Sequence, residues 1–226
     1  TYVSMVFSSM DTDYFPRLSS VKVLGTTLNV VVNRQIEMMF LLISPLLVAF
    51  IIILPVILPL LYSGKFLPVL SMAQVIVLAM YFRALEVPIE YITLARGDSS
   101  LYLFIQAVYS VIFVGLVILG YKYFGLLGAG AGITLTTIVY FLFMLLFSKS
   151  NYGFRLSSNV ALYCTLQIPL GVLAYATTFI SNPFIYWLSG VMLCLVSAFV
   201  SLTIIRKKTN VSQELSAKFK SKFKKS

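Results

Sequence analysis

The chain has 226 residues, of which 60% are hydrophobic and 11% are charged. A soluble domain of this composition would expose its apolar residues as one continuous patch, so a soluble fold is excluded and a polytopic helical membrane protein is predicted. Strand alternation is absent, which excludes a transmembrane barrel. The formal net charge is +10, but residues 206–226 carry +7 of it, so the basicity belongs to a tail and does not indicate nucleic-acid binding.

The residue types that most often carry chemistry are scarce. There is no histidine, which is the commonest general base and metal ligand. Cys164 and Cys194 fall within apolar segments and are too few for a disulfide framework or a zinc site, so we expect them to fill space in the core. The sequence therefore predicts no catalytic residue, no metal site and no cofactor.

The first 37 residues are predicted to precede the main bundle. Residues 1–10 form an apolar stretch of about 15 Å, half a membrane span, and we expect the end of a helix that starts upstream. Pro16 interrupts the next segment, and apolar residues then recur at helical spacing through Val32. Residues 11–37 are therefore predicted to form a cytoplasmic connection with a short helix in the membrane interface.

Between residues 38 and 205, apolar segments long enough to cross a bilayer alternate with short polar turns. Because short turns make consecutive helices antiparallel, we predict an all-α, up-and-down transmembrane helical bundle. It divides into a four-helix part at 38–148, two terminal transmembrane helices at 159–205 and a basic cytoplasmic tail at 206–226. The six full spans predicted are 38–62, 67–95, 101–121, 128–148, 160–179 and 184–205.

The second of these spans contains three ionisable residues within two helical turns, Arg83, Glu86 and Glu90. At about 100° per residue they share one stripe of the helix, and at ~1.5 Å per residue Arg83 lies ~18 Å from the end at residue 95, near mid-bilayer. Charges at that depth cost at least ~2.5–3.5 kcal/mol each, so they normally face a partner helix or a wet cavity. Two interpretations stay open. Either the three residues line an ion or substrate path, or Arg83 and Glu86 form an intrahelical pair while Glu90 reaches the interface.

A glycine-rich sequence at 128–132 opens the fourth span. A phosphate-binding loop is excluded, because no strand precedes the glycines and no Lys-Ser/Thr pair follows them. The spacing of Gly128 and Gly132 instead predicts a close approach of two helices.

Basic residues sort to one set of turns, which predicts the orientation of the chain. With 11–37 in the cytoplasm, fourteen Lys and Arg residues lie on the cytoplasmic side and two lie outside, so the C-terminus is predicted to be cytoplasmic. The cytoplasmic group is Arg17, Lys22, Arg34, Arg96, Lys149, Arg155 and the eight basic residues of the tail, against Lys65 and Lys122.

Within the tail, Leu215, Phe219 and Phe223 recur at i, i+4 and i+8 among lysines. This pattern is typical of a basic amphipathic helix, which would bind anionic lipids of the inner leaflet with about 1 kcal/mol per basic residue near the surface. A solvated, disordered anchor fits the same sequence.

Five short stretches stand out by their order and spacing. They are Asp-Tyr-Phe-Pro-Arg-Leu at 13–18, Val-Asn-Arg-Gln-Ile-Glu at 32–37, Leu-Tyr-Ser-Gly-Lys-Phe at 61–66, Pro-x-x-Tyr-x-x-Leu-Ala-x-Gly-Asp-Ser-x-Leu-Tyr at 88–102 and Gly-Leu-x-Gly-Ala-Gly at 125–130. Together they resemble the oligosaccharide flippases of bacterial polysaccharide biosynthesis, in the multidrug/oligosaccharidyl-lipid/polysaccharide exporter superfamily. The last two spans resemble only a generic membrane helix.

The resemblance implies a MATE-like two-lobe exporter fold around a central cavity, of which this chain is the second lobe with its terminal helices. It implies a transporter of the bacterial inner membrane that works by alternating access beside polysaccharide assembly proteins. The implied substrate is an undecaprenyl-pyrophosphate-linked oligosaccharide, such as an O-antigen or capsule precursor, which moves from the inner to the outer leaflet.

A pyrophosphate calls for cationic partners, but the stripe at 83–90 sums to −1. Either the other lobe supplies positive charge, or Arg17, Arg34 and Arg96 gather the head group at the cytoplasmic rim. The spare carboxylate is then a candidate site for a coupling proton or sodium ion.

Other functions are open from the sequence. A cation-coupled drug exporter of the same superfamily would use an acidic cavity without a basic patch. A membrane-embedded glycosyl or acyl transferase would need a catalytic base or metal-binding acids, and the one close acidic pair is Asp11 and Asp13. A structural scaffold would not need an arginine at mid-bilayer.

Overall fold

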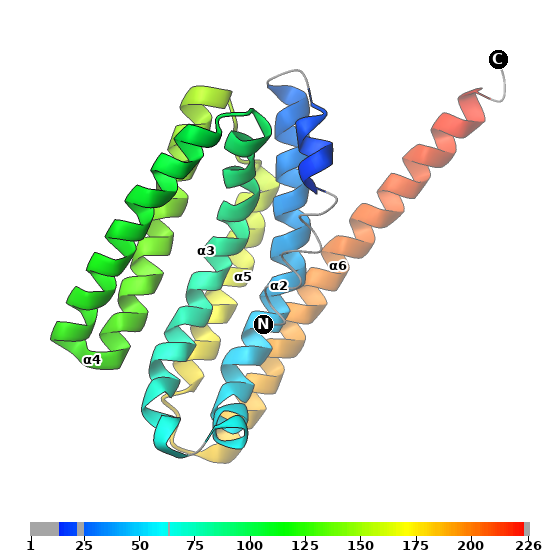
Figure 1. The fold of residues 1–226 in the computed structure, drawn as a ribbon. Coiled ribbons are helices and arrows are strands. Elements are labelled where there is room, and N and C mark those ends of the chain that lie inside the picture. The colour runs from blue at the N-terminus through cyan, green and yellow to red at the C-terminus, as the bar shows by residue number, and fades with distance from the viewer. Residues whose placement is uncertain (1–13, 22–24, 63, 224–226) are drawn as a thin grey trace.

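The computed structural model describes residues 14–21, 25–62 and 64–223, with side chains described except at 64–66 and 209–223. This part of the chain contains no strand, and about 91% of it is helical, which confirms the predicted all-α class. Five of its helices are long and apolar enough to cross a membrane. A short helix at 14–19 precedes them. The elements are α2 (Thr26–Leu61), the 3-10 helix η1 (Gly64–Val69), α3 (Leu70–Ala95), α4 (Ser99–Tyr152), α5 (Ser158–Thr177) and α6 (Pro183–Phe223) (Figure 1).

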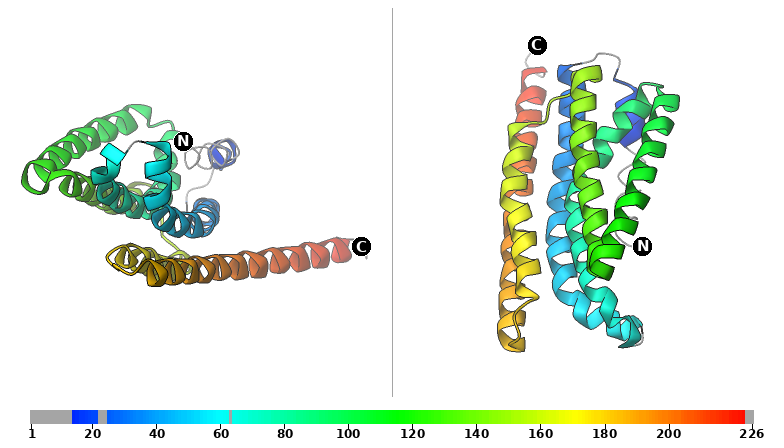
Figure 2. Two further views of the ribbon diagram at one scale, coloured as in Figure 1. Left: turned by 90° about the horizontal axis from the view of Figure 1, so that it is seen from below. Right: turned by 90° about the vertical axis from the view of Figure 1, so that its left-hand side faces the viewer.

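Helix α3 stands at the centre of the bundle (Figures 1 and 2). It packs on α4 at one side and on α2 at the other, and α2 in turn contacts α5 and α6. Within the described residues, α4 contacts α3 and η1 but none of α2, α5 and α6. The flank of α3 between α2 and α4 is therefore left without a covering helix from this part of the chain.

Helix α4 has 54 residues and would be ~81 Å long if straight, more than twice the ~30 Å hydrocarbon core of a bilayer. It folds back at Gly125 into two antiparallel arms, 99–124 and 126–152 (Figure 1). Gly125 has φ 62° and ψ −146°, a conformation that is essentially restricted to glycine. The two arms correspond to the predicted segments 101–121 and 128–148.

Glycines hold the two arms of α4 together. A Cβ at Gly128 would lie 2.1 Å from the carbonyl oxygen of Gly120, and a Cβ at Gly132 would lie 2.6 Å from that of Leu116. Only a residue without a side chain permits this backbone contact. The predicted role of Gly128 and Gly132 in a close helix–helix approach is confirmed.

Helix α2 begins earlier than the sequence pattern indicated. The predicted interfacial connection ran to residue 37, whereas α2 starts at Thr26 and includes the last part of that segment. Leu28 and Val32 are almost fully buried in the core, so the amphipathic face packs on protein. The same helical periodicity serves a protein-facing and a lipid-facing helix, which is why the pattern did not separate the two. The helix runs on through its three prolines, Pro45, Pro55 and Pro59.

Two asparagines at the start of α2 hold the loop between α4 and α5. Asn33 Oδ1 accepts a hydrogen bond from the backbone N–H of Ser157 at 2.7 Å, and its amide nitrogen donates to the carbonyl of Arg155 at 2.9 Å. Asn29 Oδ1 accepts from the N–H of Arg155 at 2.9 Å. Because Ser157 is also the N-cap of α5, these bonds fix where α5 begins relative to α2.

Replacing Asn33 with leucine should destabilise the fold, because it leaves the Ser157 N–H and the Arg155 carbonyl without this partner. A buried polar group left unpaired costs about 1–3 kcal/mol, so we expect Asn33→Leu to lower the free energy of unfolding by about 2 kcal/mol or more. Thermal unfolding in detergent, followed by circular dichroism, measures the change. Asn151→Leu is the control, since exposed Asn151 bonds within its own helix to Phe147, and we expect a change within ~0.5 kcal/mol. An equal loss for both variants would contradict the assignment.

Helices α5 and α6 are joined by a buried amide. Gln167 is fully buried, and its Nε2 donates to Ser201 Oγ at 2.9 Å and to the Ser197 carbonyl at 3.2 Å. Ser197 Oγ donates back to Gln167 Oε1 at 2.7 Å. In apolar surroundings such bonds fix the register of two helices. Cys164 and Cys194 are free and partly buried in the same pair of helices, consistent with their predicted space-filling role.

Basic residues gather at one end of the bundle, where α2 begins and α3 ends. The predicted inside and outside groups therefore lie at opposite ends, since Lys122 and the Lys65 position fall at the other turns. Lys22 and the predicted helix end at 1–10 lie outside the described residues. The described basic residues at the first end are Arg17, Arg34, Arg96, Lys149, Arg155, Arg206, Lys207 and Lys208.

Helix α6 continues past the bundle into the tail and remains helical through Phe223 (Figure 1). Where it leaves the bundle, Lys208 forms an ion pair with Glu37 of α2 and lies over the ring of Tyr163, 5.4 Å from its centroid. The helix predicted for the tail is thus present through Phe223. The side chains beyond residue 208, which would contact the inner leaflet, lie outside the described ones.

Candidate functional site

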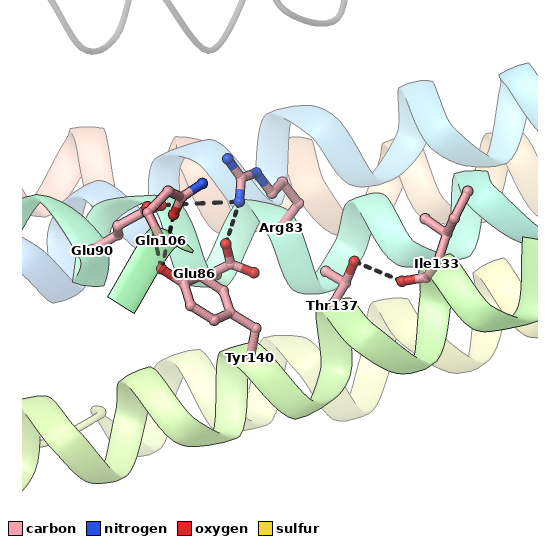
Figure 3. Close-up of polar contacts among 7 residues, drawn as sticks. All are labelled: Arg83, Glu86, Glu90, Gln106, Ile133, Thr137 and Tyr140. Atoms are coloured by element: carbon pink, nitrogen blue, oxygen red, sulfur yellow. Dashed lines mark hydrogen bonds and ion pairs between the residues drawn. The ribbon is translucent and has the colours of Figure 1, made fainter. Parts of the chain in front are cut away.

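The three ionisable residues predicted to share a stripe lie together on α3 (Figure 3). Arg83 Nη1 forms an ion pair with Glu86 Oε1 and lies 3.9 Å from Glu90 Oε2. The intrahelical pair of Arg83 and Glu86 is therefore present. Glu90, in contrast, is enclosed by the bundle and does not extend outward, because only 6% of it is exposed.

Burial differs sharply within this cluster, which we call the α3 charge cluster (Arg83, Glu86 and Glu90). Glu86 is fully buried, whereas the side chain of Arg83 is 35% exposed. One guanidinium faces two carboxylates, so the cluster carries −1 when all three groups are ionised. No donor from the described residues reaches buried Glu86 Oε2. An unpaired buried acceptor is costly, so this oxygen is where the cluster would stabilise a proton or a small cation.

Helix α4 completes the site with Gln106 and Tyr140, which the sequence pattern did not indicate. The hydroxyl of Tyr140 lies 3.3 Å from Glu90 Oε1 and 3.3 Å from Gln106 Oε1 (Figure 3). A phenol has one proton, so Tyr140 donates to one of these acceptors at a time. The sequence gives only a weak indication of these two residues, since Gln106 is an amide within an apolar span and Tyr140 lies in the middle of the next span.

The α3 charge cluster opens on a groove of about 760 Å³ that has α3 as its floor, α2 as one wall and α4 as the other. Lining residues recur along α3 from Ala73 to Leu94, which is ~32 Å of helix and close to the ~30 Å hydrocarbon core. The α3 residues are Ala73, Ile76, Val77, Met80, Arg83, Val87, Glu90, Tyr91 and Leu94. The walls are Leu47 and Phe50 of α2 and Tyr102, Tyr109, Phe113, Ile133 and Thr137 of α4.

The groove has an apolar half and a polar half. The half near Ala73 is lined by aliphatic and phenyl groups. Thr137, beside Arg83, donates its hydroxyl to the Ile133 carbonyl at 3.0 Å (Figure 3). The other half combines the charge cluster with the rings of Tyr91, Tyr102 and Tyr109. The ionisable residues that line the groove, Arg83 and Glu90, thus both lie in the second half of α3.

Arg17 and Arg96, two of the three arginines predicted at the rim, lie at the same end of the bundle as the polar half of the groove, although neither lines it. Arg17 is exposed on the helix 14–19. The rings of Tyr14 and Phe15 on that helix pack on Tyr91, which lines the groove. Arg96 directly follows the end of α3.

Arg34 lies elsewhere. It is exposed on α2, roughly on the opposite side of that helix from Leu47 and Phe50. It shares the side of α2 on which Glu37 meets Lys208 of α6. The structure therefore does not bring Arg34 together with Arg17 and Arg96.

The site places ionisable side chains and tyrosine hydroxyls along a groove that is as long as a membrane span. The described residues contain no group of three His, Cys, Asp or Glu side chains that could hold a metal ion. What the arrangement offers is reversible binding of a polar group or a cation at a buried acidic centre.

The chain matches no protein-family model, and neither a curated protein nor a solved structure matches it.

Proposed function

We propose that this chain forms the substrate path of a membrane transporter that flips an undecaprenyl-pyrophosphate-linked oligosaccharide from the inner to the outer leaflet by alternating access. The observation that carries the proposal is the buried α3 charge cluster in a groove that follows α3 for the length of a membrane span. Ionisable residues within a membrane are costly and mark substrate and ion pathways.

The shape of the groove supports a substrate with a polar head and an apolar tail. Since α4 does not contact α2 in the described chain, the groove has one long open side. A head group can move along the floor of such a groove while its lipid tail stays in hydrocarbon. The candidate partners of a pyrophosphate are Arg83 inside the groove and, at the end of the bundle beyond its polar half, Arg17 and Arg96.

Two of the five stretches that resemble flippases meet at this groove, which is further support. Tyr14, from the stretch at 13–18, donates its hydroxyl to the carbonyl of Pro88 at 2.7 Å. Pro88 begins the stretch at 88–102, which also contains Tyr91 and Tyr102 of the groove lining. Two separate stretches of the resemblance thus contribute to one site.

The proposal includes a membrane topology. The chain would cross the bacterial inner membrane six times, with the two arms of α4 counted separately, and form the second lobe of a MATE-like exporter. The basic end would face the cytoplasm together with the C-terminus, as the positive-inside rule indicates. Polysaccharide assembly proteins would act beside it.

Glu86 is the proposed site of a coupling proton or sodium ion. Its Oε2 is buried and has no donor from the described residues, and its Oε1 is held by Arg83. Binding a cation there would weaken the hold of Glu86 on Arg83 and free the guanidinium for an anionic head group. This exchange would couple the movement of the cation to the movement of the anionic head group.

A second candidate function is cation-coupled export of lipophilic cations. The observation that favours it is the −1 charge of the α3 charge cluster beside an apolar half-groove. Such a site would attract a cation directly and would need no head-group arginines.

Deleting the gene in its native host separates the two candidates. A flippase deletion is expected to reduce the surface glycan more than tenfold and to trap lipid-linked oligosaccharide in the inner leaflet, with recovery from a plasmid copy. Unchanged glycan with raised sensitivity to lipophilic cations would reject the flippase and favour the exporter. No change in either trait would reject both.

A further inference from the structure

Between the two arms of α4 lies a second cavity, of about 290 Å³, which we call the α4 slot. Its sides are Phe104, Val108 and Ile112 from the first arm and Val139 and Phe143 from the second. These five side chains are between 43% and 67% exposed. The slot therefore opens on the outer face of α4, which no other described helix covers.

The polar groups of the slot turn away from its interior. Thr136 donates its hydroxyl to the Gly132 carbonyl of its own helix at 2.7 Å. The hydroxyl of Tyr140 meets Glu90 on the α3 side, and that of Tyr109 lies toward Thr137 in the groove. A water molecule needs two to four polar partners, and apolar cavities of about 150 Å³ stay dry and bind hydrocarbon. A slot with no polar group turned into it offers water few partners and has room for an alkyl segment.

We infer that the α4 slot binds one acyl chain of a membrane phospholipid. Helix α4 is among the helices that can span a membrane, and in a membrane the face that no described helix covers would meet hydrocarbon. The slot residues 104–112 lie ~8–20 Å from the start of their arm, so the slot extends from one leaflet toward the middle of the bilayer. A phospholipid of that leaflet can insert a chain there while its head group stays at the interface.

The bound chain would rest on two rings that also belong to the candidate functional site. Tyr109 and Tyr140 form the floor of the slot, with ring centroids 4.3 Å apart. Tyr109 lines the groove on its other side, and Tyr140 bonds Glu90. The lipid chain and the α3 charge cluster are thus separated by one layer of aromatic rings. This inference stands independently of the transported substrate.

Photolabelling tests the inference on the full chain. The protein is reconstituted in phosphatidylglycerol–phosphatidylcholine vesicles that contain a phospholipid with a diazirine on one acyl chain, then irradiated, and the adducts are mapped by mass spectrometry. We expect the slot residues to be labelled at least fivefold more than exposed apolar residues of α6 such as Leu195 and Phe199. Equal labelling of both would overturn the inference, since it would describe an ordinary lipid-facing surface.

Matched tryptophan variants make the test specific. Val108 lines the slot and Val196 lies on α6, and both are 44% exposed. Val108→Trp fills the slot and is expected to lower labelling of Phe104 and Phe143 to the α6 level, whereas Val196→Trp is expected to leave it unchanged. Ile112→Trp replaces Val108→Trp if the latter elutes as an aggregate on size exclusion. Three results would assign the slot to another occupant. The first is labelling that survives both slot variants, and the second is competition by isoprenyl phosphate but not by phospholipid. The third is a cross-link between two copies of the chain at α4.

Discussion

The double variant Arg83→Ala/Glu86→Ala is expected to fold and to lose flipping by at least a hundredfold, whereas each single substitution is expected to destabilise the protein. Removing only Arg83 leaves fully buried Glu86 without its ion-pair partner, and a broken buried pair costs about 3–5 kcal/mol. Removing both members of the pair restores most of the folding, because Glu90 keeps its contact with Tyr140, but takes away the ion pair of the α3 charge cluster. Size exclusion of detergent-extracted protein reports folding, and recovery of surface glycan in a deletion strain reports flipping.

A second ion pair provides the matched control. Glu37 and Lys208 also form an ion pair within the bundle, but this pair links α2 to α6 away from the groove. Glu37→Ala/Lys208→Ala is therefore expected to keep flipping within about twofold. If the Arg83/Glu86 double variant folds and restores full glycan display, the pair has a structural role only, and the proposed path loses its main support.

Glu86→Gln isolates the proposed coupling role from the shape of the site. It keeps the volume of the side chain and the contact to Arg83 but discards the negative charge and the titratable proton. A transporter driven by a proton or sodium ion at Glu86 should then lose the dependence of its flipping rate on that ion's gradient. Flipping measured in vesicles with imposed pH or sodium gradients reports this, and an unchanged gradient dependence would place the coupling ion elsewhere.

The charge cluster could be predicted from the sequence because it depends on one helix only. The spacing of Arg83, Glu86 and Glu90 fixes their common face wherever α3 packs. The partners on α4 could not be predicted in the same way. Tyr140 meets Glu90 only because α4 folds back at Gly125 and both arms pack at one rotation against α3. Periodicity within a single helix does not specify that rotation.

The charges in the loops predicted correctly at which end of the bundle the basic residues lie. They did not predict toward which side of its helix each basic residue points. Arg34 belongs to the same group of basic residues as Arg17 and Arg96, yet it lies on the face of α2 turned away from the groove. Counting charges in turns reports which end a residue occupies and carries no information about its direction around the helix axis. The start of α2 was missed for a related reason, since an apolar stripe does not reveal whether protein or lipid covers it.

The close contact within α4 makes Gly128 one of the most sensitive positions of the chain. A Cβ there would lie 2.1 Å from the Gly120 carbonyl oxygen and 2.6 Å from Phe124 Cβ, so the arms must separate to admit it. Overpacking costs about 1–3 kcal/mol where side chains can adjust, and more where backbone must move. We expect Gly128→Ala to lower the free energy of unfolding by about 3 kcal/mol or more. Separated arms would also move Tyr140 from Glu90, so flipping should fall at least tenfold.

Gly115→Ala is the control on the same helix, because a Cβ at that position meets nothing within 4 Å. Alanine in a helix interior is more favourable than glycine by roughly 0.5–1 kcal/mol, so this variant should be neutral or slightly stabilised. The two substitutions add the same methyl group to the same helix and differ only in what the methyl group meets. Thermal unfolding in detergent compares them directly. If Gly128→Ala unfolds at the same temperature as Gly115→Ala, the arms of α4 do not pack backbone to backbone, and Tyr140 would need another route to the charge cluster.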